Sequence, residues 1–191
     1  IYRLGGVTKE QPVDVRLTAA MKTRLPWLIL NLLTALVSAT VLSVFEDTIA
    51  QVAVLAAFFP IVAGVSGSAA TQTLTVTVRG LALGDIAPDE GLKTLGRELL
   101  LGLINGLSVG VIVAAIALVW KGTPLLGLVV GGSTLLNMVC AGLAGVLVPL
   151  LMQRLKFDPA LASPILVTTT TDTLGYFFYL GLATLMITSL V

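Results

Sequence analysis

Long stretches without a charged residue divide this sequence into apolar segments separated by short polar ones. Four uncharged runs of 21, 31, 22 and 32 residues follow one another, and the last 33 residues contain a single charge, Asp172. About 20 apolar residues suffice for one helix to cross the ~30 Å hydrocarbon core, and two crossings need about 40. The pattern therefore predicts an all-α integral membrane protein with five transmembrane helices per chain, at about residues 26–45, 48–78, 99–120, 125–152 and 160–190.

Prolines and glycines refine these predicted helices. Pro26 stands in the first turn of a helix, where its missing N–H is harmless. The second predicted span is too long for one straight crossing and contains Pro60, Gly64 and Gly67, so we expect a kink or a local break there. Residues 79–98 carry many charges and are predicted to form a loop. Small residues at every fourth position favour close packing of the third and fourth spans: Gly102, Gly106, Gly110, Gly127 and Gly131.

The composition excludes the other broad classes of protein. Hydrophobic residues make up 57% of the 191 residues and charged residues only 11%, against about 25% charged in soluble domains. An intrinsically disordered chain would need low hydrophobicity and a high fraction of charged residues. A net charge of +1 offers no basic face for nucleic acid. With one cysteine and no histidine, the chain can form no internal disulfide and no histidine-ligated metal site.

The basic residues predict the orientation in the membrane. With five spans, ten of the eleven Lys and Arg residues fall on the side of the N-terminus, and Lys121 alone falls on the other. This bias predicts a cytoplasmic N-terminus and an external C-terminus. Residues 1–24 hold five of the bases and form either a solvated cytoplasmic linker or an interfacial helix capped by Asp14, whereas residues 25–191 form the membrane domain. The first residues lack a Met and read as the cut end of a longer protein.

Asp172 is the candidate functional residue, because it is the one charge deep inside a predicted span. It lies about 12 residues, or ~18 Å, into the fifth helix, near the midplane of the bilayer. A charged Asp there costs at least ~2.5–3.5 kcal/mol, and no Lys, Arg or His lies within a span to pair with it. Asp172 is therefore protonated, in contact with water, or neutralised by a mobile cation. A protonated Asp172 would serve only to form a hydrogen bond between helices.

Two polar stripes accompany this carboxylate. The run from Thr168 to Thr171 precedes Asp172, and its hydroxyls either loosen the helix, freeing carbonyls toward a cavity, or simply bond their own backbone. On the second span, Ser68, Thr71 and Thr75 share a face next to Gln72. The two stripes either face one another across a wet pathway or form ordinary hydrogen bonds between helices.

The available ligands favour a hard cation. Carboxylate, hydroxyl, amide and carbonyl oxygens predominate, and Mg²⁺ retains most of its water and needs only one or two carboxylates. Two copies of Asp172 on a two-fold axis would supply a charge of −2 for a divalent ion. A homodimeric cation channel driven by the membrane potential is one function that fits these features. The alternatives are a secondary transporter coupled to H⁺ or Na⁺ through Asp172 and a structural subunit. An enzyme does not fit, because an aspartyl dyad needs a second intramembrane Asp.

The chain resembles the transmembrane domain of the MgtE family of magnesium channels. The resemblance extends along the whole chain in order, and four segments carry it: RLPWL at 24–28, the stretch 72–85 ending in RGLALGD, DPALAS at 158–163 and TTDTLG at 170–175. In the family an Asn- and Gly-rich run is usual in the second span. Here Ser68 and Thr71 stand where Asn is common, while Gly67 and Gln72 are kept.

The resemblance implies a homodimer in the plasma (inner) membrane, with a pore on the two-fold axis lined by the second and fifth spans. It implies that Asp172 binds hydrated Mg²⁺, together with the carbonyl of Thr168, and that Asp158 helps to bind regulatory Mg²⁺ at the cytoplasmic mouth. The family's own cytosolic gating region would be absent from this chain. The expected pore-lining residues are Ser68, Thr71, Gln72, Thr169 and Gly175.

Overall fold

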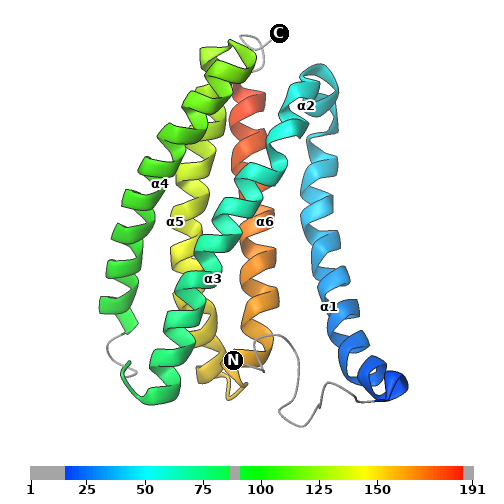
Figure 1. The fold of residues 1–191 in the computed structure, drawn as a ribbon, viewed down its shortest axis with the longest axis vertical. Helices are drawn as coiled ribbons and strands as arrows, with labels where there is room; N and C mark the ends of the chain where they lie inside the picture. Colours follow the sequence, from blue (N-terminus) through cyan, green and yellow to red (C-terminus); the bar gives the residue numbers. More distant parts are fainter. Residues whose placement is uncertain (1–15, 87–90, 187–191) are drawn as a thin grey trace.

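The computed structural model describes residues 16–86 and 91–186, and this part of the chain contains helices and no strand. Five long helices run roughly side by side along the length of the molecule, and two short ones form a corner at one end (Figure 1). In chain order the elements are α1 (Leu17–Val44), α2 (Glu46–Gln51), the 3₁₀ helix η2 (Ala53–Phe58), α3 (Phe59–Leu83), α4 (Gly91–Lys121), α5 (Pro124–Arg154) and α6 (Pro159–Leu185).

The prediction of an all-α membrane protein is confirmed by these helices. Within the described residues, four segments are long and apolar enough to cross a membrane: Leu17–Val44, Ala53–Leu83, Gly91–Lys121 and Pro124–Arg154. Helix α6 has 27 residues and packs along α5 and α3. The fifth crossing, which α6 would make, stays a prediction.

Helix α5 is the centre of the bundle. It packs against α4, α6 and α3, and many of its side chains are buried on all sides. Its contact with α4 depends on glycines, since a Cβ on Gly110 would lie 2.7 Å from the carbonyl oxygen of Gly131, and one on Gly131 would lie 2.6 Å from that of Gly110. The prediction that this glycine stripe serves helix packing agrees with these distances.

Helix α1 stands apart from the bundle and packs mainly on α6 (Figure 1). One hydrogen bond, 2.9 Å long, joins the Ser38 and Thr173 hydroxyls across this contact. Most of the remaining α1 surface is apolar and exposed, for example Leu32 at 60% and Leu36 at 55%. In a membrane protein such a surface suits lipid or another transmembrane helix.

The structure corrects the predicted course of the second span. The break lies at Val52–Phe58, before Pro60, whereas Gly64 and Gly67 lie inside the uninterrupted helix α3. Proline is accepted in the first turn of a helix, so Pro60 starts α3 rather than bending it. The expectation of a break was right, but its position was wrong.

Two predicted boundaries also change. The predicted loop 79–98 is helical for most of its described length, because α3 continues to Leu83 and α4 already begins at Gly91. Glu46 and Asp47, expected in a turn, occupy the first turn of α2, where acidic residues interact favourably with the helix dipole. Helix α1 starts at Leu17 and continues through the predicted domain boundary at residue 24, while Asp14 lies outside the described residues.

Candidate cation-binding site

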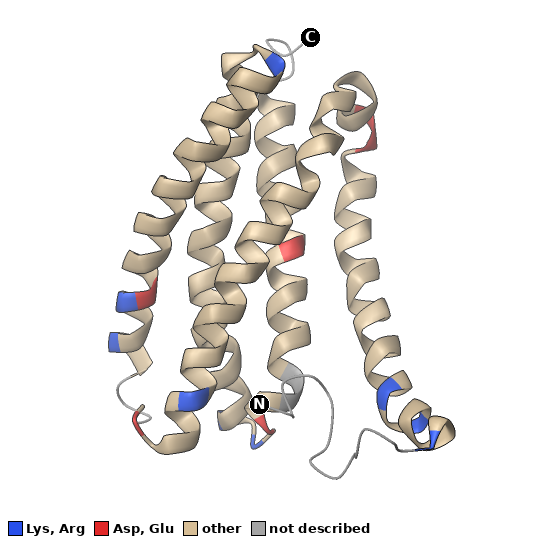
Figure 2. Cartoon of the chain, in the orientation of Figure 1, with Lys and Arg blue, Asp and Glu red and all other residues tan. Residues whose placement is uncertain are grey.

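Asp172 lies at the middle of α6, as the fourteenth of its 27 residues. Figure 2 colours the charged positions on the ribbon, and most of them lie in the outer parts of the bundle, with one acidic position halfway along α6. Asp172 is partly buried, and its carboxylate forms no ion pair or hydrogen bond with any residue that the structure describes. The position expected from the sequence is therefore the one observed along α6.

Helix α6 begins at a well-defined cap. The Oδ1 atom of Asp158 accepts a hydrogen bond of 3.0 Å from the Ala160 backbone N–H, and Pro159 occupies the first turn. An Asp N-cap followed by Pro is a strong start signal for a helix. Asp158 and Asp172 are 14 residues apart, or ~21 Å along the helix, so they cannot hold the same ion.

The threonine run does not interrupt the helix. The Thr169 hydroxyl donates to the Ile165 carbonyl at 2.7 Å, and the Thr171 hydroxyl donates to the Thr168 carbonyl at 2.9 Å. The expectation that the run loosens the helix is thus not met in this structure, and its hydroxyls mostly bond their own backbone. Thr168 is exposed, and its carbonyl oxygen, one turn before Asp172, already accepts a hydrogen bond from the Thr171 hydroxyl in addition to its place in the helix.

The second polar stripe is exposed along α3. Ser68, Thr71 and Gln72 are all exposed, and the Ser68 and Thr71 hydroxyls each donate at 2.9 Å to a carbonyl four residues earlier. A Cβ at Gly64 or Gly67, in the same part of the helix, would meet nothing within 4 Å. This face of α3 is consequently open in the single chain, and its hydroxyl oxygens can still accept hydrogen bonds from hydrated ions.

Several contacts hold α3 and the α2–η2 corner against α6. The ring of Phe59 packs edge-on against Tyr176 and Tyr179, with centroid distances of 5.6 and 5.8 Å. The buried Tyr179 hydroxyl donates to the Leu55 carbonyl at 3.0 Å. These contacts make α3 and α6, the two helices that carry polar stripes, direct neighbours.

Gly175 has a different environment from the other candidate residues. It is buried, and a Cβ there would collide with the side-chain amide of Asn137 on α5. The fully buried Asn137 donates through Nδ2 to the Val62 carbonyl at 3.4 Å, and its Oδ1 has no partner among the described residues. The structure thus brings Thr168, Thr169 and Asp172 together on α6, and Ser68, Thr71 and Gln72 together on α3, but places Gly175 in the packed interior.

Sequence reasoning missed Asn137 and Glu98. Asn137 is an isolated amide within a 32-residue uncharged run, and that isolation was the available signal. Glu98 was assigned to a loop, yet it lies on α4 and accepts a 2.9 Å hydrogen bond from the Thr73 hydroxyl of α3. The helical spacing of Leu92, Leu95 and Leu99 could have revealed this turn of helix.

Comparison with known proteins identifies the family to which this chain is similar. A family model described as MgtE, divalent cation transporter, matches residues 59–182. Three curated relatives are each named magnesium transporter MgtE. The one from Bacillus subtilis is 37% identical over 182 residues, covering 95% of this chain, and the one from Enterococcus faecalis is 36% identical with the same coverage. The one from Thermus thermophilus is 33% identical over 98% of this chain. The chain spans about two fifths of each relative's length, at 40%, 40% and 42% respectively.

Proposed function

This chain belongs to the MgtE family of divalent cation transporters, and from that premise we propose that it forms the membrane pathway of a Mg²⁺ channel. The three relatives are named for magnesium, which is why Mg²⁺ is the proposed ion. Mg²⁺ would enter the cytoplasm down the membrane potential. A divalent ion gains ~4.6 kcal/mol at −100 mV, so the transport needs no ATP and no coupled ion.

The main support for the proposal is the unpaired carboxylate of Asp172 halfway along α6. Ionisable groups at this depth are costly and mark ion pathways in membrane proteins. With no cationic partner among the described residues, a mobile cation is the charge that best compensates the carboxylate. Mg²⁺ retains most of its hydration shell, so the open hydroxyl and amide face of α3 supplies suitable partners for its water molecules.

The proposed assembly is a homodimer whose two-fold axis runs along the polar faces of α3 and α6. A single Asp172 supplies one negative charge, and the second copy supplies the other, which matches a divalent ion. In this arrangement Ser68, Thr71 and Thr169 line the pathway, and the Thr168 carbonyl lies one turn from the ion. Gln72 lies at the edge of this face, where it borders a cavity between α3 and α4. We leave Gly175 out of the lining and give it a packing role, because it is buried against Asn137.

The proposed orientation places the end of the bundle that carries most bases in the cytoplasm of a plasma membrane. Asp158, at that end, would contribute to a regulatory Mg²⁺ site shared with a cytosolic region. A secondary transporter coupled to H⁺ or Na⁺ through Asp172 is the competing function. The two differ in one measurement, since a channel conducts Mg²⁺ without a H⁺ or Na⁺ gradient and a coupled transporter does not.

The test compares Mg²⁺ uptake by the full-length protein with uptake by the Asp172→Asn and Asp172→Ala variants. We expect uptake to fall at least about tenfold in both, because a charge-assisted contact is worth ~1.5–3 kcal/mol. Asp47→Asn removes an exposed acid at the end of the bundle and serves as the matched control. Undiminished uptake in both Asp172 variants would refute the proposed role of this carboxylate.

A further inference from the structure

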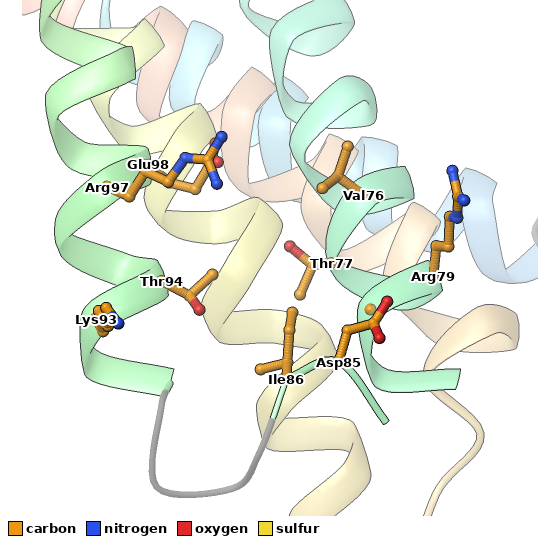
Figure 3. A pocket seen from close by; sticks show the side chains of 10 residues that line it. Val76, Thr77, Arg79, Asp85, Ile86, Lys93, Thr94, Arg97 and Glu98 are labelled. Atoms are coloured by element: carbon orange, nitrogen blue, oxygen red, sulfur yellow. The ribbon is translucent and has the colours of Figure 1, made fainter. Parts of the chain in front are cut away.

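A groove separates α3 from α4 at the end of the bundle where α4 begins. Both helices pack on α5 rather than against one another, and two adjoining cavities lie between them, with volumes of about 530 and 230 Å³. Figure 3 shows the larger cavity, lined by side chains from both helices. The two cavities share Val76, Arg97 and Glu98, and together we call them the α3–α4 groove.

The outer cavity of this groove carries a surplus of positive charge. Arg79 reaches it from α3, and Lys93 and Arg97, one turn apart, reach it from α4. None of the three forms an ion pair with a carboxylate of the described residues. Asp85 and Glu98 also line the cavity, and Glu98 already accepts a hydrogen bond from Thr73. Lys93 and Arg97 lie on the α4 wall, and Arg79 lies apart from them on α3 (Figure 3). Unpaired cations that line one cavity can bind a phosphate.

The depth of these cations matches the phosphate layer of a bilayer. The apolar run of α4 that follows Glu98 has 22 residues, or ~33 Å, and so fills the ~30 Å hydrocarbon core. Arg97 then stands at the boundary of the hydrocarbon and Lys93 about 6 Å further out, among the headgroups. Basic pockets between transmembrane helices at such a depth bind anionic lipid headgroups.

The inner cavity continues the groove toward the hydrocarbon. Its lining is mixed. Val76 and Leu101, which are 66% and 38% exposed, and Met138 of α5 are its large apolar side chains, and Gln72, Thr73 and Asn105 add polar ones. These apolar side chains lie where the acyl chain of a lipid would run, whereas a free phosphate ion would make no use of them.

We propose that the α3–α4 groove binds one anionic glycerophospholipid, with its phosphate between Arg79, Lys93 and Arg97 and an acyl chain along Val76 and Leu101. The two carboxylates select the headgroup. Asp85 and Glu98 accept hydrogen bonds but repel a second anionic group, so a headgroup with hydroxyl donors, as in phosphatidylglycerol, fits the groove.

The test measures lipid binding by the purified full-length protein in detergent. Native mass spectrometry counts bound lipids, and thermal melting compares added phosphatidylglycerol with phosphatidylcholine of the same acyl chains. We expect phosphatidylglycerol to raise the melting temperature more. The triple variant Arg79→Gln/Lys93→Gln/Arg97→Gln should lose that difference and bind at least about tenfold more weakly. The control variant Lys22→Gln/Arg154→Gln/Lys156→Gln removes three bases from the same end and should keep it.

Three outcomes would overturn the proposal. One is an unchanged preference for phosphatidylglycerol in the triple variant. Another is equal stabilisation by inorganic phosphate, because the groove would then hold a free anion rather than a lipid. The third is protection of an Arg97→Cys thiol from water-soluble reagents in the delipidated protein, because a second copy of the chain would then cover the groove.

Discussion

Asn137 and Gly175 show how two uncharged residues fix the position of a charged one. Asn137 is fully buried and bonds to the Val62 carbonyl of α3, while its amide lies against Gly175, three residues after Asp172. A side chain at position 175 would push α6 away from α5 or displace the amide from its bond. The distance between α5 and the part of α6 that carries Asp172 therefore depends on the absence of one methyl group.

Gly175→Ala is expected to lower the free energy of unfolding by about 1–3 kcal/mol, because the new methyl group overpacks this contact. SDS titration in mixed micelles would measure the change. Gly181→Ala, on the same helix with nothing within 4 Å of its Cβ, is the control and should be neutral or slightly stabilising. In the Gly175→Ala/Asn137→Ala double variant the loss should be smaller than the sum of the two single losses. Simple additivity would contradict the contact.

Asp158 caps α6, and a careful substitution can separate this cap from the proposed binding of regulatory Mg²⁺. Asp158→Ala removes both the negative charge and the N-cap of α6, at a cost of about 1 kcal/mol in stability. Asp158→Ser removes the charge and keeps a capping oxygen. If the carboxylate binds regulatory Mg²⁺, both variants should weaken the inhibition of the full-length protein by Mg²⁺, measured as flux against Mg²⁺ concentration. Normal inhibition in the Ser variant alone would reduce Asp158 to a capping residue.

At the scale of the elements, the contact between α4 and α5 is set by backbone atoms that cannot move aside. A Cβ at Gly110 would lie 2.7 Å from a carbonyl oxygen of α5, while Gly96 on the same helix has nothing within 4 Å. Gly110→Ala should therefore destabilise the protein by about 1–3 kcal/mol in the SDS titration. Gly96→Ala should be neutral or gain up to about 1 kcal/mol in helix propensity. Equal effects of the two substitutions would show that the close approach does not matter for stability.

The sequence predicted the long helices better than their connections. The uncharged run after Lys121 predicted a helix at 125–152, and α5 spans Pro124–Arg154. The early turns of α4 are not predicted, because residues 91–98 carry charges, which are also typical of a loop. Charge marks exposure to water or headgroups and does not exclude a helix. The break before Pro60 was misplaced because a proline starts a helix as readily as it bends one.

For the candidate site too, the sequence predicted some features and missed others. The depth of Asp172 followed from counting residues along one helix, which needs no tertiary information. The burial of Gly175 and the partners of Asn137 and Glu98 depend on which helix faces which, and apolar segments of similar composition do not encode that in any local pattern. The threonine run was ambiguous in the sequence because a hydroxyl bonds its own backbone or another helix with similar ease.

At the scale of the whole molecule, the distribution of bases predicts which end enters the cytoplasm. Arg79 lies near the end of α3, Lys93 near the start of α4 and Arg154 at the end of α5, whereas Lys121 ends α4. Figure 2 shows most basic positions toward one end of the bundle. Single cysteines at Glu46 and Phe157, introduced into a Cys140→Ala background, would report the orientation in intact cells. We expect a membrane-impermeant thiol reagent to label position 46 from outside and position 157 only after permeabilisation. The reverse labelling would invert the proposed orientation, and the direction of Mg²⁺ flow would have to be reconsidered.

The hydrogen bonds between α6 and the α2–η2 corner have a mechanical consequence. The Thr48 and Thr184 hydroxyls are bonded at 2.8 Å, and the Tyr179 hydroxyl donates to the Leu55 carbonyl near the same end of α6. Any sliding of this end of α6 past the corner would have to break both bonds and separate Phe59 from two tyrosine rings. The corner therefore resists sliding of this end of α6, whereas at the other end a short turn beside Asp158 joins α6 to α5.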